Sequence, residues 1–300
     1  MENHFYEKYL NNAKLFFVIS FIINIALSVW RYFMAERVSV LNSLSSTVVA
    51  IILSVVIALL FKSSVKDLSK NEKTRLLPLA FLPYTVYIIL QTITIPISNI
   101  VKLFDLDVRL QQCINTAVFA VLSFVLCMTL GVAVIKKYLS LYDEFRIYTV
   151  PSQYRLSQKW VYIILSGFGS GIIAAAIVFL FSMFTSSELD DISSPVFSIC
   201  NIVIYLLFFN AFFKNIEKRY RRVFLPTIGV SLSISALFGH LIQPVTFVLM
   251  NDILTDGFKP DGFIIRTMIM LVLSLFISIL ALVTICKIVK KSLEAFEKTE

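Results

Sequence analysis

Long apolar runs separated by short polar segments dominate the sequence. Several runs reach about 20 residues, the length of a helix that crosses the hydrocarbon core of a bilayer. The pattern predicts eight transmembrane helices, at residues 15–34, 40–61, 76–96, 115–135, 160–184, 195–213, 224–250 and 263–289. The third run contains Pro78, Pro83 and Pro96 but no charge, so we expect a kinked span there. The expected fold is therefore an all-α integral membrane protein.

The basic residues alternate between the predicted loops. The segments after the second, fourth, sixth and eighth spans are rich in them: Lys62, Lys66, Lys70, Lys73 and Arg75; Lys136, Lys137, Arg146, Arg155 and Lys159; Lys214, Lys218, Arg219, Arg221 and Arg222; Lys287, Lys290, Lys291 and Lys298. The other loops hold few, namely Arg31 and Arg37, then Lys102 and Arg109, then none, then Lys259 and Arg266. By the positive-inside rule, this alternation predicts cytoplasmic N- and C-termini.

The two halves of the chain, residues 1–148 and 149–300, resemble each other in the order of their features. The matches are Tyr9 and Lys14 with Tyr154 and Lys159, Phe61-Lys62 with Phe213-Lys214, Leu77-Pro78 with Leu225-Pro226, Pro96 with Pro244, and residues 136–143 with 290–297. The offsets between the matched residues are 145, 152, 148, 148 and 154 residues, in that order. The alternative is chance similarity between apolar segments. We favour two parallel four-helix repeats, each one domain, related by a pseudo-two-fold axis along the membrane normal.

Composition agrees with a membrane protein. Apolar residues make up 58% of the 300 residues and charged residues only 15%, against roughly 25% in soluble domains. The net charge of +8 comes from loop residues beside apolar spans, where membrane orientation and anionic lipid heads account for it. The lipid bilayer is thus the expected partner, and nucleic-acid binding is excluded.

Several kinds of chemistry have no visible residues in the sequence. The four cysteines are scattered without a C-x-x-C pair, and the only histidines are His4 and His240, so neither a disulfide framework nor a metal site is expected. We expect no cofactor and no catalytic residue, and an enzyme is the less favoured class. No Asp or Glu lies in the middle of a span, which disfavours ion-coupled transport.

The candidate binding site is a polar lining where the two halves meet. Ser233, His240 and Gln243 share one face of the seventh span. The 148-residue offset relates Ser233 and His240 to Thr85 and Thr92 of the third span, which also contains Gln91. Such a lining can hydrogen-bond a substrate. The alternative is that His240 is a neutral side chain holding two helices together.

Gly169-Ser170-Gly171, followed two spans later by His240, resembles the serine–histidine dyad of rhomboid-type intramembrane proteases, in order only. Counted from the predicted cytoplasmic ends, Ser170 lies about 15 Å and His240 about 24 Å deep at 1.5 Å per residue, too far apart for a dyad. Gly167, Gly171 and Ala175 instead form a small-residue stripe that favours close helix packing.

The expected function is that of a transport-type or permease-like component for a weakly polar or amphiphilic substrate. The alternative is a non-catalytic subunit or scaffold that docks a cytoplasmic or membrane protein such as an ATPase, and an intramembrane serine protease comes third. Short loops and the absence of a targeting signal favour a cell membrane, specifically a bacterial inner membrane.

The loop charges lead to a topology test. Cysteines introduced at Ser187 and Asp256 are expected to react with an impermeant reagent outside intact cells. Cysteines at Lys70, Ser152 and Lys218 are expected not to react, because their loops are rich in Lys and Arg. The parent chain is the control for the native thiols. Labelling of position 152 from outside contradicts the eight-helix count.

Overall fold

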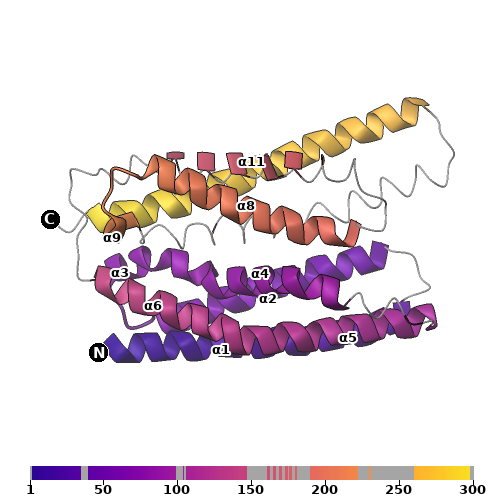
Figure 1. The fold of residues 1–300 in the computed structure, drawn as a ribbon, viewed down its shortest axis with the longest axis horizontal. Coiled ribbons are helices and arrows are strands. Elements are labelled where there is room, and N and C mark those ends of the chain that lie inside the picture. The colour runs from indigo at the N-terminus through magenta and orange to yellow at the C-terminus, as the bar shows by residue number, and fades with distance from the viewer. Residues whose placement is uncertain are drawn as a thin grey trace.

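The computed structural model describes residues 2–34, 40–98, 104, 106–146, 190–221, 230 and 260–297, with separate positions between 161 and 180. These residues are almost entirely helical, with no strand among them, and their helices run side by side in an elongated bundle (Figure 1). Four stretches of the described helices are long and apolar enough to cross a membrane: Phe5–Phe33, Thr47–Ser64, Leu77–Thr94 and Val108–Ser140. The chain therefore has the fold of a helical membrane protein.

The helices follow the predicted spans closely. Those of the first half are α1 (Glu2–Met34), α2 (Val40–Ser64), α3 (Lys70–Arg75), the 3₁₀-helix η1 (Leu77–Phe81), α4 (Leu82–Ser98), α5 (Val108–Leu126), the π-helix η3 (Cys127–Gly131) and α6 (Val132–Arg146). Those of the second half are α8 (Asp190–Phe212), α9 (Lys218–Arg221) and α11 (Pro260–Glu297). The fifth and seventh predicted spans lie largely outside the described residues, so the count of eight stays a prediction.

Several boundaries differ from the predicted spans; for example, α5 begins at Val108 rather than at residue 115, and α11 ends at Glu297 rather than at residue 289. Two other differences have physical reasons that the structure shows. α1 begins at Glu2 rather than at residue 15, because Phe5, Tyr9 and Ala13 are buried and continue the apolar face through a polar stretch. The third span is divided into η1 and α4. Pro78 stands in the first turn of η1 and Pro83 in the first turn of α4, where proline removes no helical hydrogen bond.

The fourth predicted span contains a feature that the sequence did not indicate, the π-helix η3 between α5 and α6. Gly131 ends η3 against α4 and α1. A Cβ at this position would lie 3.1 Å from Val86 Cγ1 and 3.5 Å from Phe17 Cε2. The missing side chain thus lets η3 approach both helices closely.

One hydrophobic core joins the two halves. It includes Phe16, Leu79 and Ile135 of the first half with Phe213 and Val289 of the second, all fully buried. α4 lies beside α8, and the end of α11 lies against α3 and η1 (Figure 1). The described halves therefore form a single packed unit.

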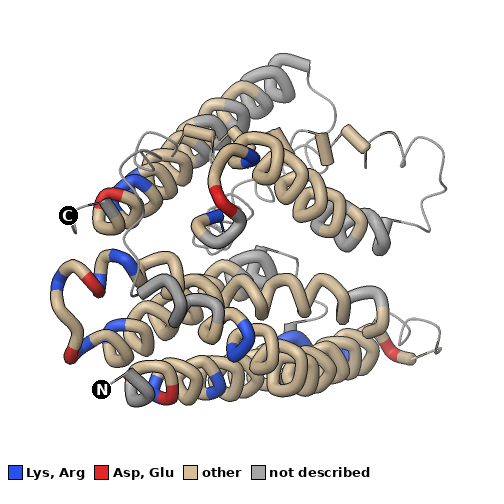
Figure 2. Tube along the Cα trace, turned by 60° about the vertical axis from the view of Figure 1, so that its left-hand side comes forward, with Lys and Arg blue, Asp and Glu red and all other residues tan. Residues whose placement is uncertain are grey.

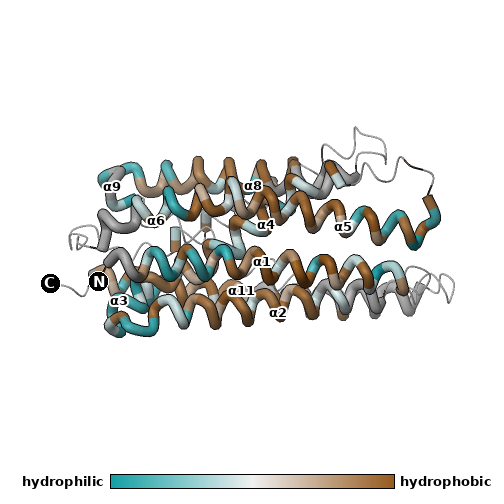
Figure 3. Tube along the Cα trace, turned by 90° about the horizontal axis from the view of Figure 1, so that it is seen from below, coloured by the Kyte–Doolittle hydropathy of each residue, from teal (hydrophilic) through white to brown (hydrophobic). Residues whose placement is uncertain are grey.

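The outer faces of the helices are apolar. On α8, Ile199, Val203 and Leu207 are 57%, 50% and 63% exposed at four-residue intervals, and α11 exposes Val272 and Phe276 in the same way. Hydrophobic residues cover most of the length of the bundle, and hydrophilic residues gather at its ends (Figure 3). Exposed apolar stripes of this length are expected of helices that face lipid.

The bundle has two distinct ends. α1 begins and α11 ends at the same end, which we call the terminal end (Figure 1). The opposite end, where α1 finishes and α5 begins, is the far end. Most described Lys and Arg residues lie toward the terminal end, on α3, α6, α9 and α11 and in the turns after α2 and α8 (Figure 2). Arg31 and Arg109 lie toward the far end.

The turns that follow α2 and α8 have the same construction. Three backbone hydrogen bonds in one turn recur in the other, always 148 residues later: Val65 N to Phe61 O with Phe213 N to Phe209 O, Leu68 N to Val65 O with Ile216 N to Phe213 O, and Lys73 N to Ser69 O with Arg221 N to Glu217 O, at 3.0–3.2 Å. Each turn leads into a short basic helix, α3 or α9. In these hydrogen bonds Phe61 occupies the position that Phe209 has in the second turn, whereas the sequence pairing matched Phe61 with Phe213.

Arg75 joins α3 to the end of α11. Its Nε donates to Ala295 O at 2.9 Å, and its guanidinium carbon lies 5.4 Å from the centre of the Phe296 ring. Ser292 Oγ donates to Arg75 O at 3.2 Å. Because these four residues are buried, their contacts are protected from competing water.

Replacing Arg75 tests how strongly this junction holds the halves together. Arg75→Ala removes a charge-assisted hydrogen bond and a cation–π contact and leaves Ala295 O without this donor. We expect a loss of about 2 kcal/mol of stability. Thermal unfolding in detergent measures it, with exposed Lys70→Ala on the same helix as the control. Equal melting temperatures for the two variants would contradict this role.

Candidate functional site

A row of polar residues occupies the inner face of α1. Ser20, Asn24 and Ser28 follow one another at four-residue intervals and are only 1%, 5% and 3% exposed, and Arg31 continues the row toward the far end. Positions four apart lie on the same side of a helix. α1 thus turns a polar face inward and an apolar face, with Ile22 and Val29, outward.

Asn24 links this face to α4. Its Nδ2 donates to Tyr87 Oη and to Ser20 O, both at 2.7 Å. Tyr87 also has a side-chain hydrogen bond with Gln91, one turn further along α4. The aromatic ring of Phe16 lies edge-on to that of Tyr87, with centroids 5.9 Å apart. A polar pair is therefore held in place by apolar packing.

α5 completes the arrangement. Ser28 Oγ donates to Cys113 O at 2.8 Å, and Arg31 Nη1 donates to Thr116 Oγ1 at 3.1 Å. Thr94 of α4 and Ser123 of α5 share a hydrogen bond of 3.0 Å. We call this set the polar stripe; its members are Ser20, Asn24, Ser28, Arg31, Tyr87, Gln91, Thr94, Cys113, Thr116 and Ser123.

The sequence-predicted site residues are distributed differently. Gln91 belongs to the polar stripe. Thr85 and Thr92 are buried on the opposite side of α4, given about 100° per residue, and donate to the carbonyls of Phe81 and Ile88 at 2.8 Å. Ser233, His240 and Gln243 lie outside the described residues.

Ser170 contacts α8. Its Oγ donates to Asn201 Oδ1 at 2.7 Å. An amide oxygen accepts a hydrogen bond but is no general base, so this contact is that of two packed helices. At the neighbouring Gly169, a Cβ would lie 2.9 Å from Phe208 Cε2, which shows how closely the two helices approach.

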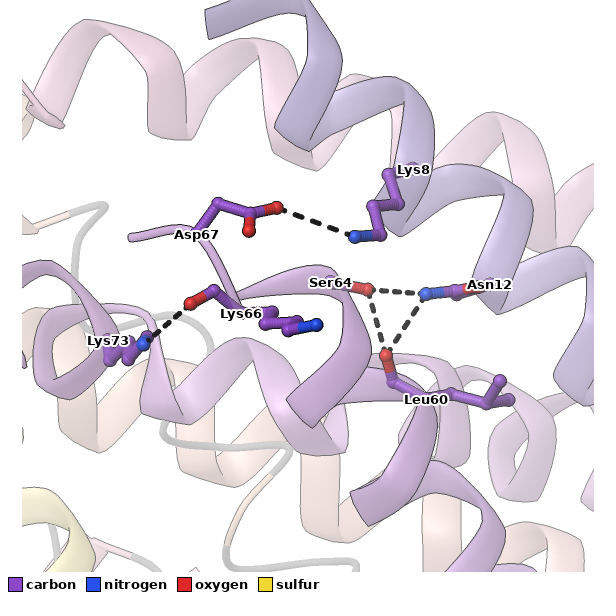
Figure 4. A network of polar contacts seen from close by, with 7 residues as sticks. All are labelled: Lys8, Asn12, Leu60, Ser64, Lys66, Asp67 and Lys73. Atoms are coloured by element: carbon purple, nitrogen blue, oxygen red, sulfur yellow. Dashed lines mark hydrogen bonds and ion pairs between the residues drawn. The ribbon is translucent and has the colours of Figure 1, made fainter. Parts of the chain in front are cut away.

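A second polar cluster lies at the terminal end of α1 and α2 (Figure 4). Asn12 Nδ2 donates to Ser64 Oγ at 2.8 Å and to Leu60 O at 3.0 Å, and Lys8 pairs with Asp67 at 3.7 Å. A cavity of about 10 Å³ beside Asn12 and Ser64 has room for roughly one water molecule. The cluster fixes the end of α2 against α1 and is too small to admit a substrate.

All four cysteines are free thiols.

Comparison of the chain with family models, with curated proteins and with solved structures finds no match. The candidate site is therefore defined by its geometry alone. The signal that marks it in the sequence is the spacing of Ser20, Asn24 and Ser28 within an otherwise apolar run, a pattern that the search for charged residues in the spans overlooked.

A double-mutant cycle tests the central pair of the polar stripe. We expect Asn24→Leu and Tyr87→Phe each to destabilise the protein, and the double variant to lose less than their sum, by about 0.6–1.7 kcal/mol. Chemical or thermal unfolding in micelles supplies the four free energies. Asn24→Leu combined with Thr129→Ala, an exposed hydroxyl bonded to its own helix at Val125 O, is the additive control. Additivity in the Asn24–Tyr87 cycle would mean that the two side chains do not interact.

Proposed function

We propose that this protein is a permease-like membrane component that handles a weakly polar or amphiphilic substrate. The observation that carries the proposal is the polar stripe between α1, α4 and α5, enclosed by helices whose outer faces are apolar. It provides hydrogen-bonding groups inside a structure that otherwise matches lipid on its surface.

The energetics of the polar stripe suit a transient ligand. A hydrogen bond between membrane helices contributes only about 0.6–2 kcal/mol, so the hydroxyl and amide groups can exchange partners with a substrate at modest cost. Apart from Arg31 at the far end, the stripe offers Ser, Thr, Asn and Tyr side chains, which bind without a full charge. This favours a substrate with a small polar head and an apolar body over a hydrated ion.

The proposal includes a duplicated architecture of eight spans, with repeats at 1–148 and 149–300 and both termini cytoplasmic. The two matching turns support it, and so does burial. Cys127, Gly131, Ile135 and Leu139 are buried, as are the residues 154 positions later, Ala281, Ile285, Val289 and Leu293. Ser20, Asn24 and Ser28 match buried Ser166, Ser170 and Ala174 at an offset of 146. Buried residues recur at four-residue intervals on any helix that packs against others, so the matching turns are the stronger argument for a duplication.

In this architecture, Thr85 and Thr92 with Ser233, His240 and Gln243 form the lining between the halves, in a cell membrane of the bacterial inner-membrane type. A second candidate function is that of a subunit docking a partner such as an ATPase. The basic residues of α3, α9 and α11 at the terminal end favour it, because they offer a charged surface outside the apolar zone (Figure 2).

Reconstitution separates the two functions. The protein is purified from its native membrane without crosslinking and placed in phosphatidylcholine vesicles. Transbilayer movement of a fluorescent lysophosphatidylcholine is then followed by dithionite quenching. As a permease, the protein alone is expected to accelerate this movement over protein-free vesicles. A stoichiometric ATPase in the preparation, together with no acceleration by the purified chain, would instead favour the subunit function.

Variants locate the path of the probe. Asn24→Leu is expected to slow movement about tenfold, the effect of roughly 1.4 kcal/mol, because it removes the amide that would hydrogen-bond the substrate in the polar stripe. His240→Leu is expected to do the same if the lining between the halves takes part, and His240→Gln to retain more activity. Thr129→Ala, exposed on the outer surface, is the control. Unchanged rates in Asn24→Leu would exclude the polar stripe as the path.

A further inference from the structure

The guanidinium of Arg31 is directed into the bundle, away from the nearest helix end. Ser28 contacts Cys113, which sets the level at which the antiparallel helices α1 and α5 lie beside each other. Along α1, Arg31 lies three residues closer to the far end than Ser28. Its hydrogen-bond partner Thr116 lies three residues further from the far end than Cys113, along α5. Each three-residue step is about 4.5 Å. The side chain therefore runs back toward the middle of the membrane zone instead of snorkelling outward.

The charge of Arg31 is not compensated by the described residues. Among them it forms no ion pair, and its one hydrogen bond goes to Thr116. Thr116 is a neutral hydroxyl; its Oγ1 donates its own proton to Gln112 O at 2.8 Å and accepts the hydrogen bond from Arg31. A guanidinium has five N–H donors and favours a planar, two-oxygen acceptor such as a carboxylate or phosphate. Within the described part of the chain, most N–H donors of the Arg31 guanidinium therefore remain able to bond a ligand.

Exposed apolar and aromatic residues flank Arg31 in the sequence of α1 and lie on the first turn of α5. On α1, Trp30 and Phe33 beside it are exposed, as is Val29, and on α5 so are Val108 and Leu110. Aromatic side chains at the end of a span are typical of the level of lipid headgroups. A molecule that bonds Arg31 from this direction has its polar part between α1 and α5 and its apolar part against lipid or the outer helix faces.

We propose that Arg31, held in place by Thr116, binds the anionic head, a carboxylate or phosphate, of a single-chain amphiphile that enters the polar stripe from the far end. The inference rests on the proposed function, because it names the substrate class of the same stripe. Ser28 adds a hydroxyl one turn deeper, beside Asn24. The head then meets a positive charge first and neutral hydrogen-bonding groups beyond it.

Direct binding tests the anion site. The purified protein in phosphatidylcholine nanodiscs is titrated calorimetrically with dodecyl phosphate, with dodecanol and with inorganic phosphate. We expect dodecyl phosphate to bind at least tenfold more tightly than dodecanol, because only the former pairs with the guanidinium. Inorganic phosphate is expected to bind more weakly than dodecyl phosphate. Equal affinity for inorganic phosphate would assign the site to free anions and overturn the amphiphile class.

Variants attribute the preference to Arg31. Arg31→Gln is expected to bind dodecyl phosphate no better than dodecanol, whereas Arg109→Gln, at the same end of the bundle, is expected to keep the preference. Tight binding of dodecyl phosphate by Arg31→Gln overturns the proposal. If Arg31→Gln does not fold, the parent protein still tests the proposal: equal affinities for dodecyl phosphate and dodecanol would overturn it. Movement of zwitterionic lysophosphatidylcholine is a separate readout, so the anion site can fail while the permease function stands.

Discussion

Every polar group inside a membrane protein must find its partner within the protein, because the hydrocarbon around it offers none. In this chain, that constraint determines where Asn24 and Tyr87 lie. Asn24 satisfies its amide with Ser20 O and Tyr87 Oη, and both residues are thereby fixed between α1 and α4. The same requirement draws Ser28 to Cys113 and Thr94 to Ser123, so the polar residues hold three helices in one register. The site proposed for substrate is built from groups that also organise the first half.

The hydrophobic core and the polar stripe hold different parts of the bundle together. The core, from Phe16 and Leu79 to Val289 and Phe296, joins the two halves toward the terminal end, where Arg75 adds its contacts with α11. The polar stripe extends toward the far end, where the contacts are hydrogen bonds of modest energy.

Much of the fold follows from the sequence, and much of the site does not. Apolar runs of about 20 residues indicated a helical membrane protein and the approximate positions of its long apolar helices, because hydrophobic length is a local property. The extra turns of α1 and the π-helix at Cys127–Gly131 depend on packing against other helices, which no local pattern records. The site was sought around His240 because an ionisable group stands out in a span. Asn24 and Ser28 are individually ordinary, and only their contacts with Tyr87 and Cys113 distinguish them.

The most direct test of this account concerns which side of α1 meets lipid. Spin labels placed singly along residues 18–33 in a bilayer report collisions with oxygen, which concentrates in lipid. The structure requires high oxygen accessibility at Ile22, Val29 and Phe33 and low accessibility at Ser20, Asn24 and Ser28, with a period near 3.6 residues. Accessibility that peaks at Asn24 and Ser28, or that shows no helical period, would contradict a polar stripe enclosed by the first half.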